Sequence, residues 1–188
     1  MTEIELAEGC KRGENRARRA LYESYSGAMF GLCLRYAGNR EDAEDCLQDG
    51  FLRLFEVIGK FQYRGPGSLD AWVKRVFTNL CLDRINKKKR SAEEDVENVP
   101  DVPDDDGDDS GLLDLPAEKI VELMGLLPEG FRTVLNLYLV EGWSHREIAA
   151  KLGISESTSA SQYLRAKKRF RKILEDYLNN QEITDSHE

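Results

Sequence analysis

The stretch that most constrains the fold is residues 142–172, which have the pattern of a helix, a tight turn and a second, basic helix. Ser144 and Glu147 have the spacing of a capping box, and the apolar residues that follow repeat at helical intervals. Gly153 is expected to end this first helix, because glycine adopts the left-handed conformation at little cost. Ser155 can then cap the second helix, so the stretch predicts two helices joined by a glycine turn.

The second helix of this stretch has two contrasting faces. One face carries mostly apolar residues spaced three and four apart, namely Ser159, Tyr163, Ala166, Phe170, Ile173, Leu174 and Tyr177. The opposite face carries hydroxyls and cations, namely Ser157, Ser161, Arg165, Lys168 and Lys172. Cations bind phosphates and hydrogen-bonding side chains bind base edges, so this face suits a recognition helix in a DNA major groove. An ordinary helical hairpin with a solvated basic face is the alternative interpretation.

Charge divides the chain into segments. The 188 residues carry a net charge of −8, yet residues 1–90 are net +4 and residues 119–172 are net +5, whereas residues 91–118 contain 12 acids and no base. The prolines, glycines and aspartates of this connector leave too little apolar surface to form a core, which predicts a flexible, self-repelling linker. We therefore expect an all-α protein of two small helical domains joined by an acidic linker. The expected boundaries are 1–90 for the first domain, 91–116 for the linker, 117–180 for the second domain and 181–188 for a polar tail.

Within the first domain, apolar periodicity predicts three helices, over about 15–36, 39–58 and 68–90. The middle helix begins with a dense acidic run formed by Glu41, Asp42, Glu44, Asp45 and Asp49. The helix dipole favours part of this charge. The remainder fits either an exposed acidic ridge that docks on a basic protein surface or a merely solvated helix face.

The third predicted helix and the loop before it form a basic region. The loop, residues 61–67, places aromatic and polar groups between glycines, and residues 68–90 contain seven bases and two acids. The expected buried stripe of this helix is Leu69, Trp72, Val73, Val76 and Leu80, and the residues expected to lie away from it are Lys74, Arg75, Thr78 and Asn79. A basic helix beside an aromatic loop can hold unstacked bases while cations hold the backbone. Trp72 is expected to be a core residue.

In the second domain, two further helices are expected before the helix–turn–helix stretch. One spans residues 117–127, and the other begins at Pro128 and ends at Gly142. Tyr138 and Leu139 fall on the apolar spacing of the latter helix and are expected to be buried. Beyond Leu178 the chain is polar and is expected to fray.

Several classes of protein are disfavoured by the sequence. The four cysteines, Cys10, Cys33, Cys46 and Cys81, are far apart and form no CxxC pair or Cys/His cluster, so we expect reduced, mostly buried thiols and no metal site. No apolar run resembles a signal peptide or a membrane span, so a cytoplasmic protein is expected. With two histidines, no glycine-rich phosphate loop and no nucleophile signature, we expect neither an enzyme nor a cofactor.

Four stretches carry a resemblance to a known family: NREDAEDCLQDGFLRLFE at 39–56, GSLDAWVKRVFTNLCLDRINKKKR at 67–90, LPEGFRTVLNLYLVEGWSHREIAAKLGIS at 127–155, and the ST and LRAKKR segments within 157–169. They are similar, in this order, to the extracytoplasmic-function (ECF) sigma factors, the compact branch of the sigma-70 class of bacterial RNA polymerase subunits. The resemblance covers most of both domains. It implies a protein that binds core RNA polymerase and directs promoter-specific initiation of transcription.

The resemblance also implies roles for residues of the first domain. This domain would bind the clamp helices of the polymerase through the acidic ridge, at Asp42, Asp45, Gln48 and Asp49. It would also open the minus-ten promoter element and accept a flipped-out base in the loop over residues 62–67. The residues implied in this reading are Gln62, Tyr63, Arg64, Lys74, Arg75 and Asn79.

The second domain would read the minus-thirty-five element as duplex, with its rear face on the polymerase flap tip. The implied contacts are a phosphate for Thr158, base edges for Ser161 and Arg165, and the DNA backbone for Lys167, Lys168 and Arg169. The chain departs from the family at Ala160 and Gln162, where a cation is frequent, and at Ser159, where valine is usual. These departures leave the promoter sequence open.

The resemblance also implies a role for the acidic linker and one further partner, and one competing function stays open. The acidic linker would either imitate nucleic acid in the RNA exit path or act as a soluble spacer, and an anti-sigma factor would use the surfaces assigned to the polymerase. The competing function is a helix-turn-helix repressor or response-regulator-like protein, which would bind duplex DNA without core polymerase.

Overall fold

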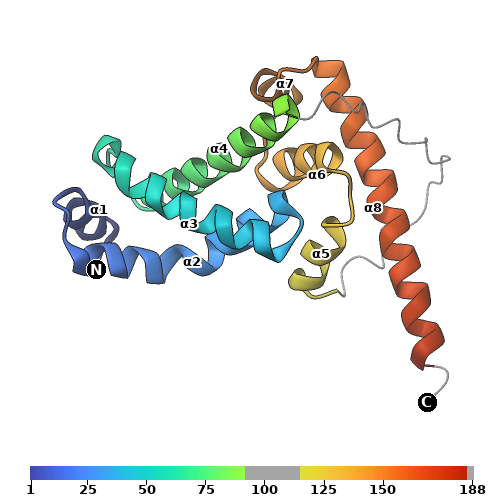
Figure 1. Ribbon diagram of the computed structural model, residues 1–188, viewed down its shortest axis with the longest axis horizontal. Helices are drawn as coiled ribbons and strands as arrows, with labels where there is room; N and C mark the ends of the chain where they lie inside the picture. The colour runs from blue at the N-terminus through green and yellow to red at the C-terminus, as the bar shows by residue number, and fades with distance from the viewer. Residues whose placement is uncertain (92–114, 186–188) are drawn as a thin grey trace. The chain divides into compact units, whose positions relative to one another are not determined.

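The computed structural model describes residues 1–91 and 115–185, and the elements within them are helices (Figure 1), which confirms the expected all-α class. The chain divides into two compact units, Met1–Glu93 and Glu94–Glu188, and each has buried apolar residues of its own. The linker prediction falls almost wholly on residues 92–114, which lie outside the described residues.

The first unit consists of α1 (Glu3–Lys11), α2 (Asn15–Ala37), α3 (Arg40–Val57), η1 (Ile58–Lys60) and α4 (Ser68–Ser91). The three helices that the sequence predicted are α2, α3 and α4, and each packs against the other two. Gly38, at φ +80°, ends α2 in the left-handed conformation that favours glycine. Asn39 then caps α3, because its side-chain oxygen accepts a hydrogen bond from the Asp42 backbone N–H at 2.9 Å.

The helix α1 was not expected from the sequence. Thr2 and Glu5 form a capping box at its start: the Thr2 hydroxyl accepts from the Glu5 N–H, and the Glu5 carboxylate accepts from the Thr2 N–H at 2.8 Å. Leu6, Ala7 and Cys10 are buried, and α1 packs against α2 and η1. The T-x-x-E spacing of a capping box is the sequence signal that could have revealed this helix.

The helix α4 buries a wider face than its predicted stripe, because it packs against both α2 and α3. Phe77, which lies outside that stripe, is fully buried, and its ring occupies the space that a side chain at Gly50 of α3 would need. Thr78 is only 3% exposed. The expectation that Thr78 belongs to the polar face is therefore wrong.

The second unit consists of α5 (Ala117–Met124), α6 (Glu129–Leu135), η3 (Asn136–Val140), α7 (His145–Leu152) and α8 (Glu156–Asp185). The long helix α8 packs against α5, α6 and α7. The core contains Met124, Leu127, Phe131, Leu135 and Ala166, with Ile120, Tyr163, Phe170 and Ile173 packed against it. The apolar face predicted for the second helix of the helix–turn–helix stretch is thus the face of α8 that meets this core.

The helix that begins after Pro128 does not continue as a regular α-helix to Gly142. The helix α6 ends at Leu135, and the chain continues in η3, a single π-helical turn. A π turn contains an extra residue, which changes the direction of the side chains that follow. Tyr138 and Leu139 are therefore 37% and 58% exposed, and the expectation that they are buried is wrong.

The helix α8 is longer than expected. The helix α8 continues past Leu178 to Asp185, so the expected fraying after Leu178 is not observed. Among the described residues, no helix combines the length and the apolar character that a membrane span needs.

Candidate nucleic-acid interface

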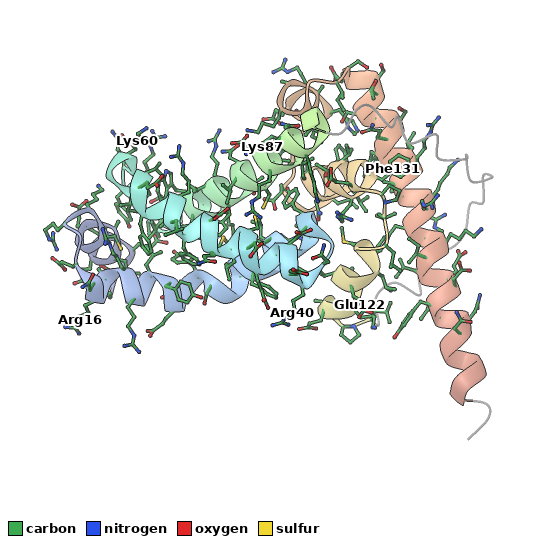
Figure 2. The ribbon with its side chains drawn as sticks, in the orientation of Figure 1. Arg16, Arg40, Lys60, Lys87, Glu122 and Phe131 are labelled. Carbon is green, nitrogen blue, oxygen red and sulfur yellow. The ribbon has the colours of Figure 1, made fainter. Side chains whose placement is uncertain are left out.

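An open pocket of about 530 Å³ lies on the first unit, between the loop that follows η1 and the start of α4. Its lining residues are Lys60, Phe61, Gln62, Arg64, Ser68, Ala71, Trp72 and Arg75. The centroids of the Phe61 and Trp72 rings lie 5.4 Å apart, and three cations line the same pocket, namely Lys60, Arg64 and Arg75. Lys60 lies at the end of η1 (Figure 2). Aromatic rings stack on bases and cations bind phosphates, so the pocket can hold an unstacked nucleotide.

The pocket brings together three of the six residues expected to read the minus-ten element, namely Gln62, Arg64 and Arg75. The other three are not among its lining residues. Tyr63 is 42% exposed beside the lined stretch, Lys74 forms an ion pair with Asp70 at 2.9 Å, and Asn79 is half-buried one turn beyond Arg75.

Trp72 was expected to be a core residue, and the structure corrects this. It is half-buried and lines the pocket. It lies one turn into α4, beside Phe61 of the preceding loop, and one of its sides is left open to the pocket. The apolar spacing of α4 was read correctly at Leu69 and Val73, which are fully buried.

The loop beside the pocket is held by Glu3, a residue that the sequence analysis missed. The Glu3 carboxylate accepts hydrogen bonds from the Gly67 N–H at 3.1 Å and from the Leu69 N–H at 3.5 Å. The first N–H groups of a helix lack intrahelical partners, so a carboxylate at this position caps α4 and complements its dipole. Gly67 has φ +82°, a conformation that favours glycine. No local pattern reveals a contact between residues 64 positions apart.

The acidic ridge predicted for α3 exists, but part of its charge is paired within the unit. Asp49 forms an ion pair with Arg84 of α4 at 2.5 Å, and Asp42 lies 3.9 Å from the ammonium of Lys88. Asp45 and Gln48 are exposed on the same helix. Cations near the end of α4 therefore offset part of the negative charge of the ridge.

In the second unit, local hydrogen bonds shape the helix–turn–helix as predicted. Ser144 and Glu147 form the capping box of α7, and Gly153, at φ +69°, ends that helix. The Ser155 hydroxyl accepts from the Thr158 N–H at 3.0 Å and caps α8. The pKa of Glu147 lies below its ordinary value because its carboxylate accepts hydrogen bonds from Ser144.

The exposed face of α8 carries the residues expected to contact the minus-thirty-five element. Ser161, Arg165 and Lys167 are exposed, whereas Thr158, Lys168 and Arg169 are half-buried. Two of the hydroxyls already make local hydrogen bonds: Thr158 Oγ1 lies 2.7 Å from the Ser155 Oγ, and Ser161 Oγ donates to the Thr158 carbonyl at 3.0 Å. Each hydroxyl oxygen keeps a lone pair with which it can accept from a ligand.

Comparison with known proteins agrees with this geometry in both units. The Sigma-70 region 2 family model matches residues 21–91, and the Sigma-70 region 4 family model matches residues 117–170. The ECF RNA polymerase sigma factor SigW of Bacillus subtilis is 31% identical over 176 residues, which cover 88% of this chain and 93% of that protein. The chain belongs to the ECF sigma factors.

Other relatives agree with this membership. The ECF RNA polymerase sigma factor SigE of Mycolicibacterium smegmatis is 33% identical over 162 residues, and the alignment covers 84% of this sigma factor and 60% of that relative. A solved structure of the sigma factor RpoE in complex with the anti-sigma factor NepR, from Bartonella quintana, has a TM-score of 0.50 at 20% identity. It covers 84% of this chain and 96% of that chain, and at this identity it supports the fold alone. Sigma factors are transcription initiation factors.

The polar residue Ser159, where the family usually has valine, is accommodated in the core of this sigma factor. Ser159 is fully buried, and its hydroxyl oxygen lies 3.0 Å from Nδ1 of His145 on α7. The His145 ring stacks on Tyr138 of η3, with centroids 4.4 Å apart and planes at 12°. This hydrogen bond satisfies a buried hydroxyl and joins the two helices of the helix–turn–helix.

Three of the cysteines of this sigma factor lie together, a grouping that the sequence did not reveal. Cys33 of α2, Cys46 of α3 and Cys81 of α4 are distant in sequence, yet their sulfur atoms all lie within 4.8 Å of one another. The helices bring them together because each cysteine lies on the face that its helix turns towards the core. Hydrogen bonds among the thiols lower the pKa of Cys46 and raise the pKa of Cys33 and of Cys81. All four cysteines are free and buried, which confirms the expected reduced, buried thiols, and Cys10 alone lies outside the group.

Proposed function

We propose that this sigma factor binds core RNA polymerase through α3, reads the minus-ten element with the pocket beside α4, and reads the minus-thirty-five element with α8. The single observation that carries the proposal is the pocket, in which an aromatic pair and three cations lie together on the first unit. A DNA-binding protein that reads only duplex has no need of such a pocket, whereas a protein that opens a promoter does.

At the pocket, the proposed ligand is a base that has left the stack. Extraction of a base costs a few kcal/mol, which stacking and phosphate contacts must offset. Trp72 would supply the stacking surface, Phe61, which is only 3% exposed, would support the Trp72 ring from the core, and Arg64 and Arg75 would bind the adjacent phosphates. Gln62 can donate to and accept from the base edge, which makes it the residue of this set best suited to select a base.

At α8, the proposed ligand is the major groove of a duplex. Arg165 would donate two hydrogen bonds to a guanine, the commonest specific contact of arginine with DNA. Ser161 donates its proton to the Thr158 carbonyl, so it would accept from an amino group of a base. Thr158, Lys167, Lys168 and Arg169 would hold the DNA backbone around these two residues.

At α3, the proposed partner is the basic surface of the polymerase clamp helices. Asp45 and Gln48 face solvent and would meet the clamp directly. Asp42 and Asp49 would exchange or share the cations Lys88 and Arg84, with which they lie in the free protein. An anti-sigma factor would compete for the same ridge, and its binding would exclude the polymerase.

The proposal assigns this sigma factor no catalytic activity and places it in the cytoplasm with the polymerase. The structure does contain a serine–histidine contact, between Ser159 and His145. Because Ser159 is 0% exposed, this hydroxyl is closed to any substrate, so the contact is better explained as part of the core.

Transcription in vitro tests the proposal. Core RNA polymerase is mixed with the full chain on a library of promoter sequences, and the starts of the transcripts are mapped. We expect defined starts that share two sequence elements and that need both the chain and the core enzyme. A chain that binds duplex DNA tightly by itself and neither associates with core polymerase nor produces defined starts would support the repressor alternative.

A further inference from the structure

The three clustered thiols of the first unit have no role in the proposed promoter recognition. Cys33, Cys46 and Cys81 are at most 3% exposed, and the sulfur atoms of Cys46 and Cys81 are 3.2 Å apart. We propose that these three cysteines form a binding site for a soft, thiophilic metal cation, monovalent copper, which no role in transcription initiation requires.

The number and kind of ligands point to this class of ion. Thiolates are soft ligands, which select monovalent copper, zinc or iron–sulfur clusters over hard cations. A structural zinc site takes four ligands in a tetrahedron. Among residues 1–91 and 115–185, no histidine, aspartate or glutamate joins the three cysteines in the cluster. A three-coordinate site of sulfur alone favours monovalent copper.

The spacing of the sulfur atoms fits a shared ion. Three sulfur atoms placed around a central ion at about 2.3 Å, the zinc–sulfur distance, would lie about 4.0 Å from one another. The sulfur atoms of Cys46 and Cys81 are 3.2 Å apart and all three lie within 4.8 Å of one another, which is close to the spacing that a shared ion needs. Side-chain rotation of this size needs no rearrangement of the three helices.

The surroundings can offset the charge of a metal–thiolate site. Three thiolates around a monovalent cation leave a net charge of −2, which would be costly in an apolar core without nearby cations. The guanidinium of Arg84 interacts electrostatically with Cys46 and also forms the ion pair with Asp49 at 2.5 Å. Because Arg84 is shared with Asp49, it would offset part of this charge from the rim of the core.

The site would link the two functional surfaces of the first unit. The ion would bind one residue each of α2, α3 and α4, and α3 carries the acidic ridge while α4 carries one side of the pocket. Binding to the folded state alone also stabilises that state by mass action. The ligands must lose protons on binding, so the apparent affinity is expected to rise with pH.

Metal competition with the full-length, reduced protein under anaerobic conditions tests the site. Monovalent copper is presented as its complex with a coloured chelator of known affinity, and transfer to the protein is followed by the loss of colour. We expect one equivalent to bind to the wild type and to Cys10→Ala, the matched control, because Cys10 is also buried but lies outside the cluster. Each of Cys33→Ala, Cys46→Ala and Cys81→Ala should weaken binding by at least about a hundredfold, the upper end of the cost of losing an outer-shell partner.

Two further measurements keep the test decisive. If an alanine variant does not give the helical circular dichroism of the wild type, X-ray absorption of copper-loaded wild type replaces it, and three sulfur neighbours are expected. Fewer sulfur neighbours would overturn the site. Equal affinity of the wild type and a folded cluster variant would also overturn it and leave the thiols as core packing. Uptake of zinc in preference to copper would overturn the assignment to copper.

Discussion

The two units of this sigma factor present nucleic acid with surfaces of different shape. The first unit offers a pocket lined by Phe61, Trp72 and several cations, and the second offers the outward face of one helix, with Ser161 and Arg165 exposed on it. A pocket can enclose a base that has left the duplex, whereas a helix face fits the major groove of an intact duplex. If the proposed function holds, one chain is shaped for both states of promoter DNA.

The two surfaces also differ in how they are held. The helix–turn–helix depends on contacts between near neighbours, such as those of Ser155 with Thr158 and of Ser144 with Glu147. The pocket loop depends on Glu3, 64 residues away, and on the packing of α4 against α2 and α3. Substitution of residues that are distant in sequence from the pocket loop, such as Glu3, is therefore expected to weaken minus-ten recognition. Minus-thirty-five recognition should persist in such variants.

The largest effect is expected from charge reversal on the acidic ridge, which would disable both surfaces together. Asp45→Lys with Asp49→Lys should abolish measurable binding to core polymerase, because close charge pairs at interfaces contribute roughly 1.5–7 kcal/mol each. Binding is measured by co-elution of the holoenzyme, and folding by circular dichroism. Glu56→Lys, near the other end of α3, is the matched control and should assemble normally. Intact assembly of the double variant would contradict the proposed docking surface.

A smaller effect, confined to the first unit, is expected from Trp72→Ala. Loss of the stacking surface should weaken binding of the holoenzyme to a forked minus-ten promoter fragment by about 3 kcal/mol, the upper end for base stacking, because Phe61 also loses its neighbour. Trp72→Phe should recover most of this loss. Binding to a duplex that contains only the minus-thirty-five element should stay unchanged, and equal losses on both DNA fragments would show that the two surfaces are not separate.

Substitutions on α8 should give the reverse pattern. Arg165→Ala is expected to cost about 1–3 kcal/mol at promoter DNA and to relax one base preference, whereas Lys168→Ala should weaken all sequences alike and lower the salt slope by about 1. Competition binding of holoenzyme across single-base variants of the minus-thirty-five element, at several salt concentrations, separates these outcomes. An unchanged order of base preference in Arg165→Ala would remove Arg165 from the base-reading set.

The smallest effect is expected from Glu3→Gln, which keeps the shape of the side chain and removes its charge. The loss of a charge-assisted cap on α4 should cost about 1 kcal/mol. We expect a minus-ten affinity several-fold lower, with minus-thirty-five affinity unaltered. Glu5→Gln, in the same helix but directed to its own cap at Thr2, is the control. A decrease of the same size in both variants would mean that α1 acts through its stability and not through the loop.

The sequence predicted those features that depend on near neighbours. The caps at Ser144 and Ser155, the turn at Gly153 and the two faces of α8 all follow from spacings of a few residues. The three main helices of the first unit were likewise predicted from their apolar periodicity. The exposed position of Arg165 was also foreseen, because helical phase fixes which side chains point away from the core.

The features that the sequence did not predict depend on contacts between distant residues or on irregular backbone. Tyr138 and Leu139 are exposed because a π turn interrupts their helix, and no spacing rule marks that turn. Phe77 is buried because Gly50 of a different helix leaves room for its ring. The cysteine cluster likewise needs three helices to meet, so separate positions in the chain gave no sign of it.

The position of Glu3 has a practical consequence for how this protein is trimmed or tagged. The family match begins at residue 21, so a fragment designed on that boundary would keep every matched residue and lose the whole of α1. Such a fragment would keep the residues of the pocket but release the loop over residues 62–67 from its anchor at Glu3. Promoter melting measured with it would underestimate the contribution of α1.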